Sequence, residues 1–178
     1  MLIVIAQRLD VILGSGIYDS QGTTLDKPSR RIILNADIVA ARNAIKISGT
    51  ASDIIIDNSN LVGGIESGYH AVDIATNYVE SVLISSKIRT LLGDYNIYFS
   101  SNTAQTLGLV VINDCVLNGS TKSHIRFATP ASVAGIRIRD NTFESGLTFD
   151  VNINNASLWS VISENYKSDG AVATLNGS

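Results

Sequence analysis

Hydrophobic and polar residues alternate in short runs along this chain, and one such run recurs with a polar turn behind it. The clearest copies are residues 108–115, 134–141 and 159–165, and each leads into an Asn/Asp-rich turn followed by a glycine. Alternation with a period of two is typical of a β-strand that buries one face. The pattern therefore predicts short strands joined by polar turns.

The copies are regularly spaced. Running the pattern back towards the N-terminus adds residues 53–59 and 81–87. The isoleucines that anchor the copies, at steps of 28, 28, 26 and 24 residues, are Ile56, Ile84, Ile112, Ile138 and Ile162. A period of this length is one supersecondary unit that stacks on its neighbours and buries a continuous core.

Three repeat folds have periods in this range. A leucine-rich horseshoe would show its Leu/Asn consensus and a helical segment, and a hexapeptide left-handed helix would show a strict six-residue step, but neither signal is present. Irregular steps and Asn-bearing turns favour a right-handed parallel β-helix, because surface loops tolerate insertions. We predict an all-β solenoid of about six coils.

Each coil is predicted to hold a second strand. Side chains alternate faces along a strand, so apolar residues two apart point inward together. These pairs are Ile45/Ile47, Val72/Ile74, Ile97/Phe99, Ile125/Phe127 and Leu147/Phe149. Rungs about 4.8 Å apart would turn them into aliphatic ladders, and their burial, at about 25 cal/mol per Å², would be the main stabilising contribution.

The first thirty residues lie outside this repeat. Residues 2–13 are apolar enough for a strand or a short amphipathic helix. A β-solenoid needs a cap, because its end rung would otherwise expose unpaired backbone and core side chains. We therefore predict a capping or attachment segment over residues 1–30 and a β-helix domain over residues 31–178.

The run from Ile136 to Gly146 (IRIRDNTFESG) resembles the pectin-lyase-like right-handed parallel β-helix superfamily, which includes bacteriophage tailspike and tail-fibre proteins. Asn58, Asn141 and Asn165 lie near the turn where members of that superfamily stack Asn side chains. The resemblance covers roughly residues 31–176 and concerns architecture, so it is specific for fold and weak for function. It implies a virion tail protein that assembles in the host cytoplasm.

Composition agrees with such a fold. The chain is 45% hydrophobic and 6% aromatic, with 2 prolines, which suits β-branched strands and polar turns. A net charge of -3 gives no basic footprint, so we expect no nucleic-acid partner. No run is long enough to span a membrane, and polar residues interrupt the apolar start too early for the usual signal peptide.

The sequence predicts no cofactor and no metal. His70 and His124 have no partner at zinc-ligand spacing, and no Asp-rich calcium loop is present. Cys115 is the one cysteine, so an internal disulfide is excluded. We interpret Cys115 as a small turn or core residue rather than a nucleophile, because no nearby base is evident.

The outward side of the first strand is apolar where it should meet solvent. The residues concerned are Ile55, Leu83, Leu109, Val111, Trp159 and Val161, with Arg137 the one charged member of the column. One explanation is that a loop or the N-terminal segment covers them. The explanation we favour is a subunit interface, because extended apolar surface usually marks association, and the resemblance implies a parallel homotrimer.

The outward side of the second strand is polar and aromatic. The predicted ligand-binding residues on or beside it are Tyr69, His70, Asp73, Tyr98, His124, Arg126 and Asp150. Such a face can hold an extended sugar chain, with rings on the aromatic groups and hydroxyls on the charged ones. The alternative is an ordinary solvated sheet face. The resemblance implies a host-surface polysaccharide, or another tail protein, as the partner.

A column of carboxylates follows the first strand, at Asp114, Asp140 and Glu164. Neighbours one rung apart would approach the roughly 5 Å spacing of a retaining glycosidase pair. A polysaccharide depolymerase is thus the alternative function, with Asp73 and Asp150 as a second candidate pair. Turns are rich in such residues, however. The catalytic motifs of the enzymes in the superfamily that this chain resembles are matched only in part, at residues 123–125 and 137–139. The sequence therefore favours a binding or structural role.

Overall fold

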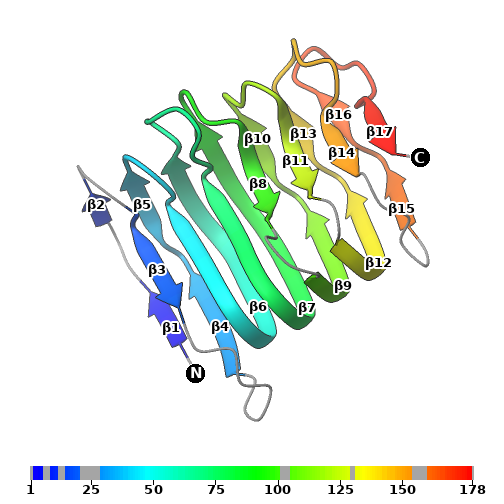
Figure 1. Ribbon diagram of the computed structural model, residues 1–178. Helices are drawn as coiled ribbons and strands as arrows, with labels where there is room; N and C mark the ends of the chain where they lie inside the picture. The colour runs from blue at the N-terminus through cyan, green and yellow to red at the C-terminus, as the bar shows by residue number, and fades with distance from the viewer. Residues whose placement is uncertain are drawn as a thin grey trace.

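The chain forms a right-handed parallel β-helix in a computed structural model that describes residues 2–5, 9–11, 15–20, 29–100, 105–128, 131–153 and 160–177. Figure 1 shows the strands side by side from the N-terminus to the C-terminus. The predicted fold class is confirmed. Over these ranges all regular structure is β-strand, and no helix has the length and apolarity needed to cross a membrane.

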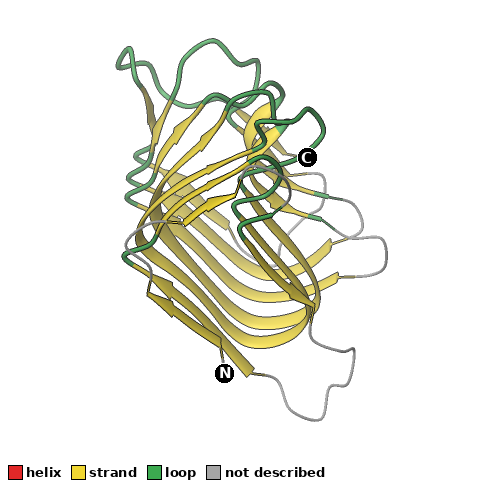
Figure 2. Cartoon of the chain, turned by 90° about the vertical axis from the view of Figure 1, so that its left-hand side faces the viewer, coloured by secondary structure: helices red, strands yellow, loops and turns green. Residues whose placement is uncertain are grey.

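Each coil has three sides, which we name faces A, B and C in chain order, with loops at the corners (Figure 2). Face A holds β1 (Leu2–Ile5), β4 (Ser29–Leu34), the middle of β6 (Ile45–Gly63) and of β7 (Val72–Thr90), β9 (Gln105–Asn113), β12 (Ala131–Arg139) and β15 (Ser160–Ser163). Face B holds β2 (Leu9–Val11), β5 (Asp37–Ala40), the ends of β6 and β7, β10 (Val116–Asn118), β13 (Thr142–Phe143) and β16 (Tyr166–Lys167). Face C holds β3 (Ile17–Ser20), the starts of β6 and β7, β8 (Tyr95–Phe99), β11 (Ser123–Phe127), β14 (Val151–Ile153) and β17 (Leu175–Gly177).

The anchoring isoleucines lie in one column inside face A, as the repeat predicted. Ile56 pairs with Ile84, and the pairing continues through Ile112 and Ile138 to Ile162. The first four are fully buried, and Ile162 is partly buried against the same core. Ile33 and Val4 extend the column towards the N-terminus, so the ladder starts earlier than the sequence pattern indicated.

The inward ladders of face C are confirmed except at one coil. Ile45, Val72, Ile97 and Ile125 form one column, and Ile47, Ile74, Phe99 and Phe127 form the next. The expectation that Leu147 and Phe149 continue these columns is wrong. Val151 and Ile153 pair with Ile125 and Phe127 instead, and Phe149 is exposed. Val151 follows Phe143 by eight residues, just as Ile125 follows Leu117, so the strand begins four residues after Leu147.

Face B was not predicted as a strand. Its rungs are short, and each contributes one fully inward side chain in the core: Ile38, Leu61, Ile88, Leu117 and Phe143. The sequence showed these residues only as the apolar position behind each polar turn. A two-residue strand such as β13 gives too little alternation to detect.

The first described strands belong to the same stack. β1, β2 and β3 pair in parallel with β4, β5 and β6 respectively. The early apolar segment therefore contains strands, and these form a rung of the helix. A capping or attachment role for residues 1–30, and the boundary at residue 31, stay predictions.

The corner between faces A and B carries two stacked columns. Asn35, Asn58, Asp114, Asp140 and Glu164 all have left-handed backbone, with φ between 47° and 59°, a conformation that Asn and Asp tolerate best among non-glycine residues. We name this column the left-handed ridge. The next residue in each of these coils is buried, and where it is polar its side chain bonds to a neighbouring coil.

That buried column includes two of the three predicted stacking asparagines. Asn141 accepts the backbone N–H of Cys115 (2.9 Å), and Asn165 accepts the backbone N–H of Asn141 (3.2 Å). Asn58 lies on the exposed ridge instead, where it donates to Asn35 (2.6 Å). The buried place in its coil belongs to Ser59, whose hydroxyl accepts the N–H of Ala36.

Candidate functional site

The outer side of face C carries the polar column that the sequence indicated. Tyr18, Lys46, Asp73, Tyr98 and Arg126 stack in consecutive rungs. A hollow of about 570 Å³ lies over this column and is lined in part by Lys46, Tyr69, His70, Asp73 and Tyr98. Its volume is within the range of small-ligand sites. The structure thus brings four of the seven predicted ligand-binding residues together around one hollow.

Asp73 is held in place by three donors. Its Oδ2 atom receives Lys46 Nζ (2.9 Å) and Asn43 Nδ2 (3.2 Å), and its Oδ1 atom receives the hydroxyl of Ser100 (2.5 Å). The carboxylate is buried, whereas about a third of the Lys46 side chain is exposed. The carboxylate therefore positions Lys46, whose remaining N–H groups are the ones a ligand in the hollow can reach.

Three rings form the aromatic wall of this region. His70 meets the Tyr98 ring edge-on at 4.5 Å between centroids, and Tyr95 stacks on Tyr98 at 4.9 Å. Burial lowers the pKa of His70, against the opposing charges of Asp73 and Asp94, so the ring is neutral at neutral pH. Burial and the neighbouring Tyr95 raise the pKa of Tyr98. The wall is therefore an uncharged, rigid surface of the kind on which sugar rings stack.

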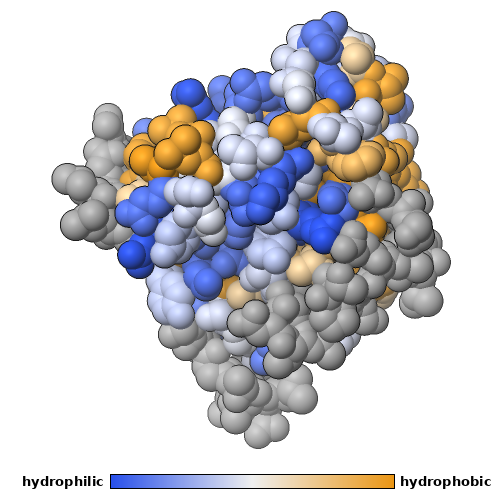
Figure 3. All heavy atoms as spheres, turned by 45° about the horizontal axis from the view of Figure 1, so that its top comes forward, coloured by the Kyte–Doolittle hydropathy of each residue, from blue (hydrophilic) through white to orange (hydrophobic). Residues whose placement is uncertain are grey.

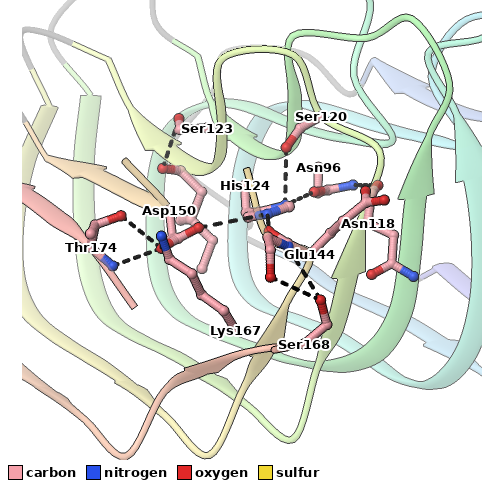
Figure 4. Close-up of polar contacts among 12 residues, drawn as sticks. Asn96, Asn118, Ser120, Ser123, His124, Glu144, Asp150, Lys167, Ser168 and Thr174 are labelled. Atoms are coloured by element: carbon pink, nitrogen blue, oxygen red, sulfur yellow. Dashed lines mark hydrogen bonds and ion pairs between the residues drawn. The ribbon is translucent and has the colours of Figure 1, made fainter. Parts of the chain in front are cut away.

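His124 and Asp150 do not lie on this outer face. Both side chains are fully buried at the corner between faces B and C (Figure 4). In that position neither side chain can touch a ligand bound over Tyr98. Arg126 is on the outer face, where its guanidinium donates to Asn152 in the next rung.

The buried corner is a ladder of polar side chains that the sequence did not reveal. Asn96 Oδ1 lies 2.6 Å from His124 Nδ1, and His124 Nε2 lies 3.8 Å from Asp150 Oδ1. Asp150 Oδ2 accepts the N–H (2.7 Å) and the hydroxyl (2.8 Å) of Thr174, with Lys167 Nζ at 3.6 Å. Figure 4 shows these contacts crossing successive coils. The ladder ties the last coils of the described chain together.

The same corner contains a Ser–His–Asp sequence of contacts, because the Ser120 hydroxyl lies 3.0 Å from His124 Nδ1. It does not form a catalytic triad. Asn96 donates through its amide nitrogen to the carbonyl of Asn118 (2.7 Å), so its oxygen faces Nδ1, and Nδ1 carries a proton in the tautomer that satisfies this contact; the Glu144 carbonyl faces Nε2 at 3.0 Å. A protonated Nδ1 cannot accept the proton of a nucleophilic serine. Burial also lowers the pKa of His124, against the opposing effects of the Glu144 carbonyl and the Asp150 carboxylate.

The three candidate catalytic carboxylates all belong to the left-handed ridge. Asp114, Asp140 and Glu164 are exposed, and Arg139 forms ion pairs with both Asp140 (2.9 Å) and Glu164. The shared arginine offsets the repulsion between these two carboxylates. Turn geometry and ion pairing account for the presence of these carboxylates without a catalytic role. In the described part of the chain, no group of three or more His, Cys, Asp or Glu side chains is arranged to hold a metal ion.

The apolar column on the outside of face A is present in the structure. Ile55, Leu83, Val111, Arg137 and Val161 stack in register. Ile32 and Ile3 extend it, and Leu109 lies beside it. Leu83, Leu109 and Val161 are between 37% and 43% exposed. Trp159 lies outside the described residues. The subunit interface stays a prediction, supported by an apolar column in which Arg137 is the one charged side chain among the described residues.

Exposed hydrophobic residues also occur elsewhere. Figure 3 shows mainly hydrophilic residues over the middle of the surface in view and hydrophobic ones towards its ends. Near the C-terminal end of the described chain these include Tyr166, Val172 and Leu175. They give a comparison set for the face A column, because they are as exposed but do not form one in-register line.

Comparisons with protein-family models, curated proteins and solved structures found no match to this chain. The likeness to the β-helix superfamily therefore stands on the fold alone, and no relative supports the pectin-lyase-like or tailspike assignment. Function has to be argued from the faces of the solenoid.

Proposed function

We propose that this chain is a structural protein of the bacteriophage tail-fibre or tailspike type, which associates with copies of itself through face A and binds a host-surface polysaccharide over face C. The observation that carries the proposal is the contrast between these two outer faces. Face A presents an apolar column along the stack, and face C presents aromatic and charged groups around a hollow. Large exposed apolar surfaces mark association, and concave sites with a few placed polar groups bind ligands.

The geometry of face A supports self-association. A flat sheet face repeats its outward column at each rung, about 4.8 Å apart, so two or three copies in parallel can bring equivalent side chains together. Closed symmetric assemblies are the usual outcome for identical chains. A parallel homotrimer would place three face A columns at the axis and leave each face C outside.

Light scattering on a size-exclusion column tests this part. We expect a trimer for the native chain and a monomer or aggregate for Val111→Asp with Val161→Asp. The matched control is Val116→Asp with Val172→Asp, which changes two exposed valines away from face A and should leave the trimer intact. An unchanged mass for the face A variant, or a monomeric native chain, contradicts the interface.

Binding of a polysaccharide is tested on arrays of bacterial surface glycans. Tyr98→Ala removes the ring that contacts both His70 and Tyr95 and should abolish binding, because stacking on an aromatic face supplies much of the contact area in such sites. Tyr166→Ala is the control, since Tyr166 is an exposed tyrosine on face B. Equal binding by both variants would show that the hollow is not the site.

The geometry of the ridge carboxylates does not favour hydrolysis as a second function. Each occupies a left-handed corner position, and Arg139 neutralises two of them. A reducing-end assay on the bound glycan separates binding from depolymerisation, since release of new ends that depends on Asp114 or Asp140 would support hydrolysis instead.

A further inference from the structure

One coil lacks a residue that the others have at the corner between faces A and B. From the anchoring isoleucine to the next inward residue the count is five at Ile56–Leu61 and Ile112–Leu117, but four at Ile84–Ile88. The pairing confirms this, because Ile84 lies opposite Ile112 while Lys87 lies opposite Val116. The missing residue is the one with left-handed backbone, so the ridge is interrupted between Asn58 and Asp114.

The interruption leaves a notch of about 470 Å³, which is separate from the hollow over face C. Asn58 and Asp114 form its two walls, two rungs apart, and Ser85, Ser86 and Lys87 form its floor. Two rungs correspond to roughly 10 Å. The notch is therefore wide enough for one ring-sized group lying between the two ridge side chains.

The side chains around the notch have unused hydrogen-bonding capacity. Among the described residues, the Asp57 carboxylate, the Ser85 hydroxyl and the Lys87 ammonium group have no side-chain partner. Asn58 uses its amide nitrogen on Asn35 (2.6 Å), which leaves its oxygen as an acceptor. Donors and acceptors thus lie together around a small space. A ligand that satisfies them must both donate and accept hydrogen bonds.

The charge of the lining residues restricts the class of ligand further. Asp57 and Asp114 outnumber Lys87 at the notch, and the one other carboxylate that lines it, Asp37, accepts a hydrogen bond from Asn60 (2.8 Å). Like charges in contact are unfavourable, so an acidic ligand is disfavoured. Hydroxyl groups both donate and accept, and an amine complements the carboxylates.

We propose that the notch between Asn58 and Asp114 is a binding site for a saccharide unit that is uncharged or carries an amine. The ring lies over Ser85, with its hydroxyl or amino groups on Asp57 and Asp114 and a further oxygen on Lys87. The site does not depend on ligand binding over face C, and Tyr98→Ala leaves it intact.

The test is a titration of the ¹⁵N-labelled full chain with glucosamine, glucose and glucuronate, followed by amide chemical shifts. Shifts at Asn58, Ser85, Lys87 and Asp114 are expected with glucosamine and glucose, with affinity falling in the order glucosamine, glucose, glucuronate. No shift with any probe, or glucuronate binding as tightly as glucosamine, overturns the proposal.

A variant that fills the notch supplies the structural control. Insertion of Asn between Ser85 and Ser86 gives that coil the same pattern as residues 56–61, where Asn58 precedes Ser59, and should weaken glucosamine binding at least tenfold. Unchanged binding by the folded insertion variant also overturns the site.

Two conservative substitutions keep the test valid if the insertion does not fold. Asp114→Asn retains a residue suited to left-handed backbone and should reduce the preference for glucosamine over glucuronate at least threefold. Asp140→Asn makes the same change at an equivalent ridge position outside the notch and should leave that preference unchanged. Equal effects of the two variants would show that the notch does not select the ligand.

Discussion

Replacing Asp150 with alanine should strongly destabilise the protein. The side chain is fully buried, and its Oδ2 atom accepts two hydrogen bonds from Thr174, at 2.7 and 2.8 Å. Lys167 Nζ lies 3.6 Å from the same oxygen, with only 13% of its side chain exposed. The substitution therefore leaves two half-buried donors and one nearly buried cation without this acceptor. Removing one partner of a buried ion pair costs about 3–5 kcal/mol.

The free energy of unfolding is measured by urea denaturation followed by circular dichroism. For a chain of this size each kcal/mol corresponds to roughly 2–4 °C in Tm, so a decrease of roughly 6–20 °C is expected in a thermal scan. Hydrogen exchange should accelerate first in residues 166–177, because Asp150 connects that coil to the one before it.

Asp94→Ala is the matched control. Asp94 forms an ion pair with Lys122 at 2.8 Å, and 61% of the Lys122 side chain is exposed. Exposed pairs of this kind contribute less than about 1 kcal/mol. If Asp150→Ala destabilises the protein no more than Asp94→Ala, the buried polar corner is not what holds the last coil in place.

Three further outcomes follow from burial and register. Burial raises the pKa of Cys115 to about 12, so Ellman's reagent at pH 8 should react only as fast as the protein unfolds, and rapid labelling of the native chain would contradict this. Phe127→Ala should lower the free energy of unfolding by about 3–5 kcal/mol, because Phe127 is buried and stacked on Phe99. Phe149→Ala should lower it by less than about 1 kcal/mol, because Phe149 is exposed. Equal effects of the two substitutions would refute the register of β14. Burial lowers the pKa of His70 below its ordinary value of 6.5, so the unfolded chain binds the proton more tightly and stability falls as the pH drops below about 6.5. His70→Gln should reduce the slope of stability against pH between pH 7 and 5, leaving the contribution of His124, whose pKa is lowered in the same way. An unchanged slope would count against this reasoning.

The sequence was sufficient to predict the column of anchoring isoleucines, because a period in the twenties with one strongly apolar position per coil fits few folds. It was also sufficient for the outward columns, since the two-residue alternation of each strand determines which side chains share a face. Lys46, Asp73, Tyr98 and Arg126 stack as that alternation predicted.

The buried polar corner could not be predicted because one strand was placed four residues too early. Aligned on Ile97, Ile125, Val151 and Leu175, the preceding residues are Asn96, His124, Asp150 and Thr174, which together form the ladder. Leu147 and Phe149 give an apolar alternation inside the corner over residues 144–150, and the strand was placed on them instead of on Val151. The misplaced strand explains why Asp150 was put with the outward groups. His124 was put there because it alternates with Ile125, but Ser123, His124 and Ile125 are all buried, so the alternation does not hold at this corner.

The third strand of each coil and the interrupted ridge were missed for a related reason. Both depend on counting residues through a corner, and corner lengths vary between coils. Ser86 takes the buried place two residues after its anchor, whereas Cys115 takes it three residues after. Pairing in space was needed to show that these two residues are equivalent.

Because each coil pairs only with the coils before and after it along the stack, stability is close to a sum of nearest-neighbour contributions. The cross-section is therefore independent of length. A segment that begins and ends at equivalent anchors can be removed or duplicated while the ladders on either side stay continuous. A protein with this architecture can therefore change its length in steps of one coil while its three faces keep the same structure.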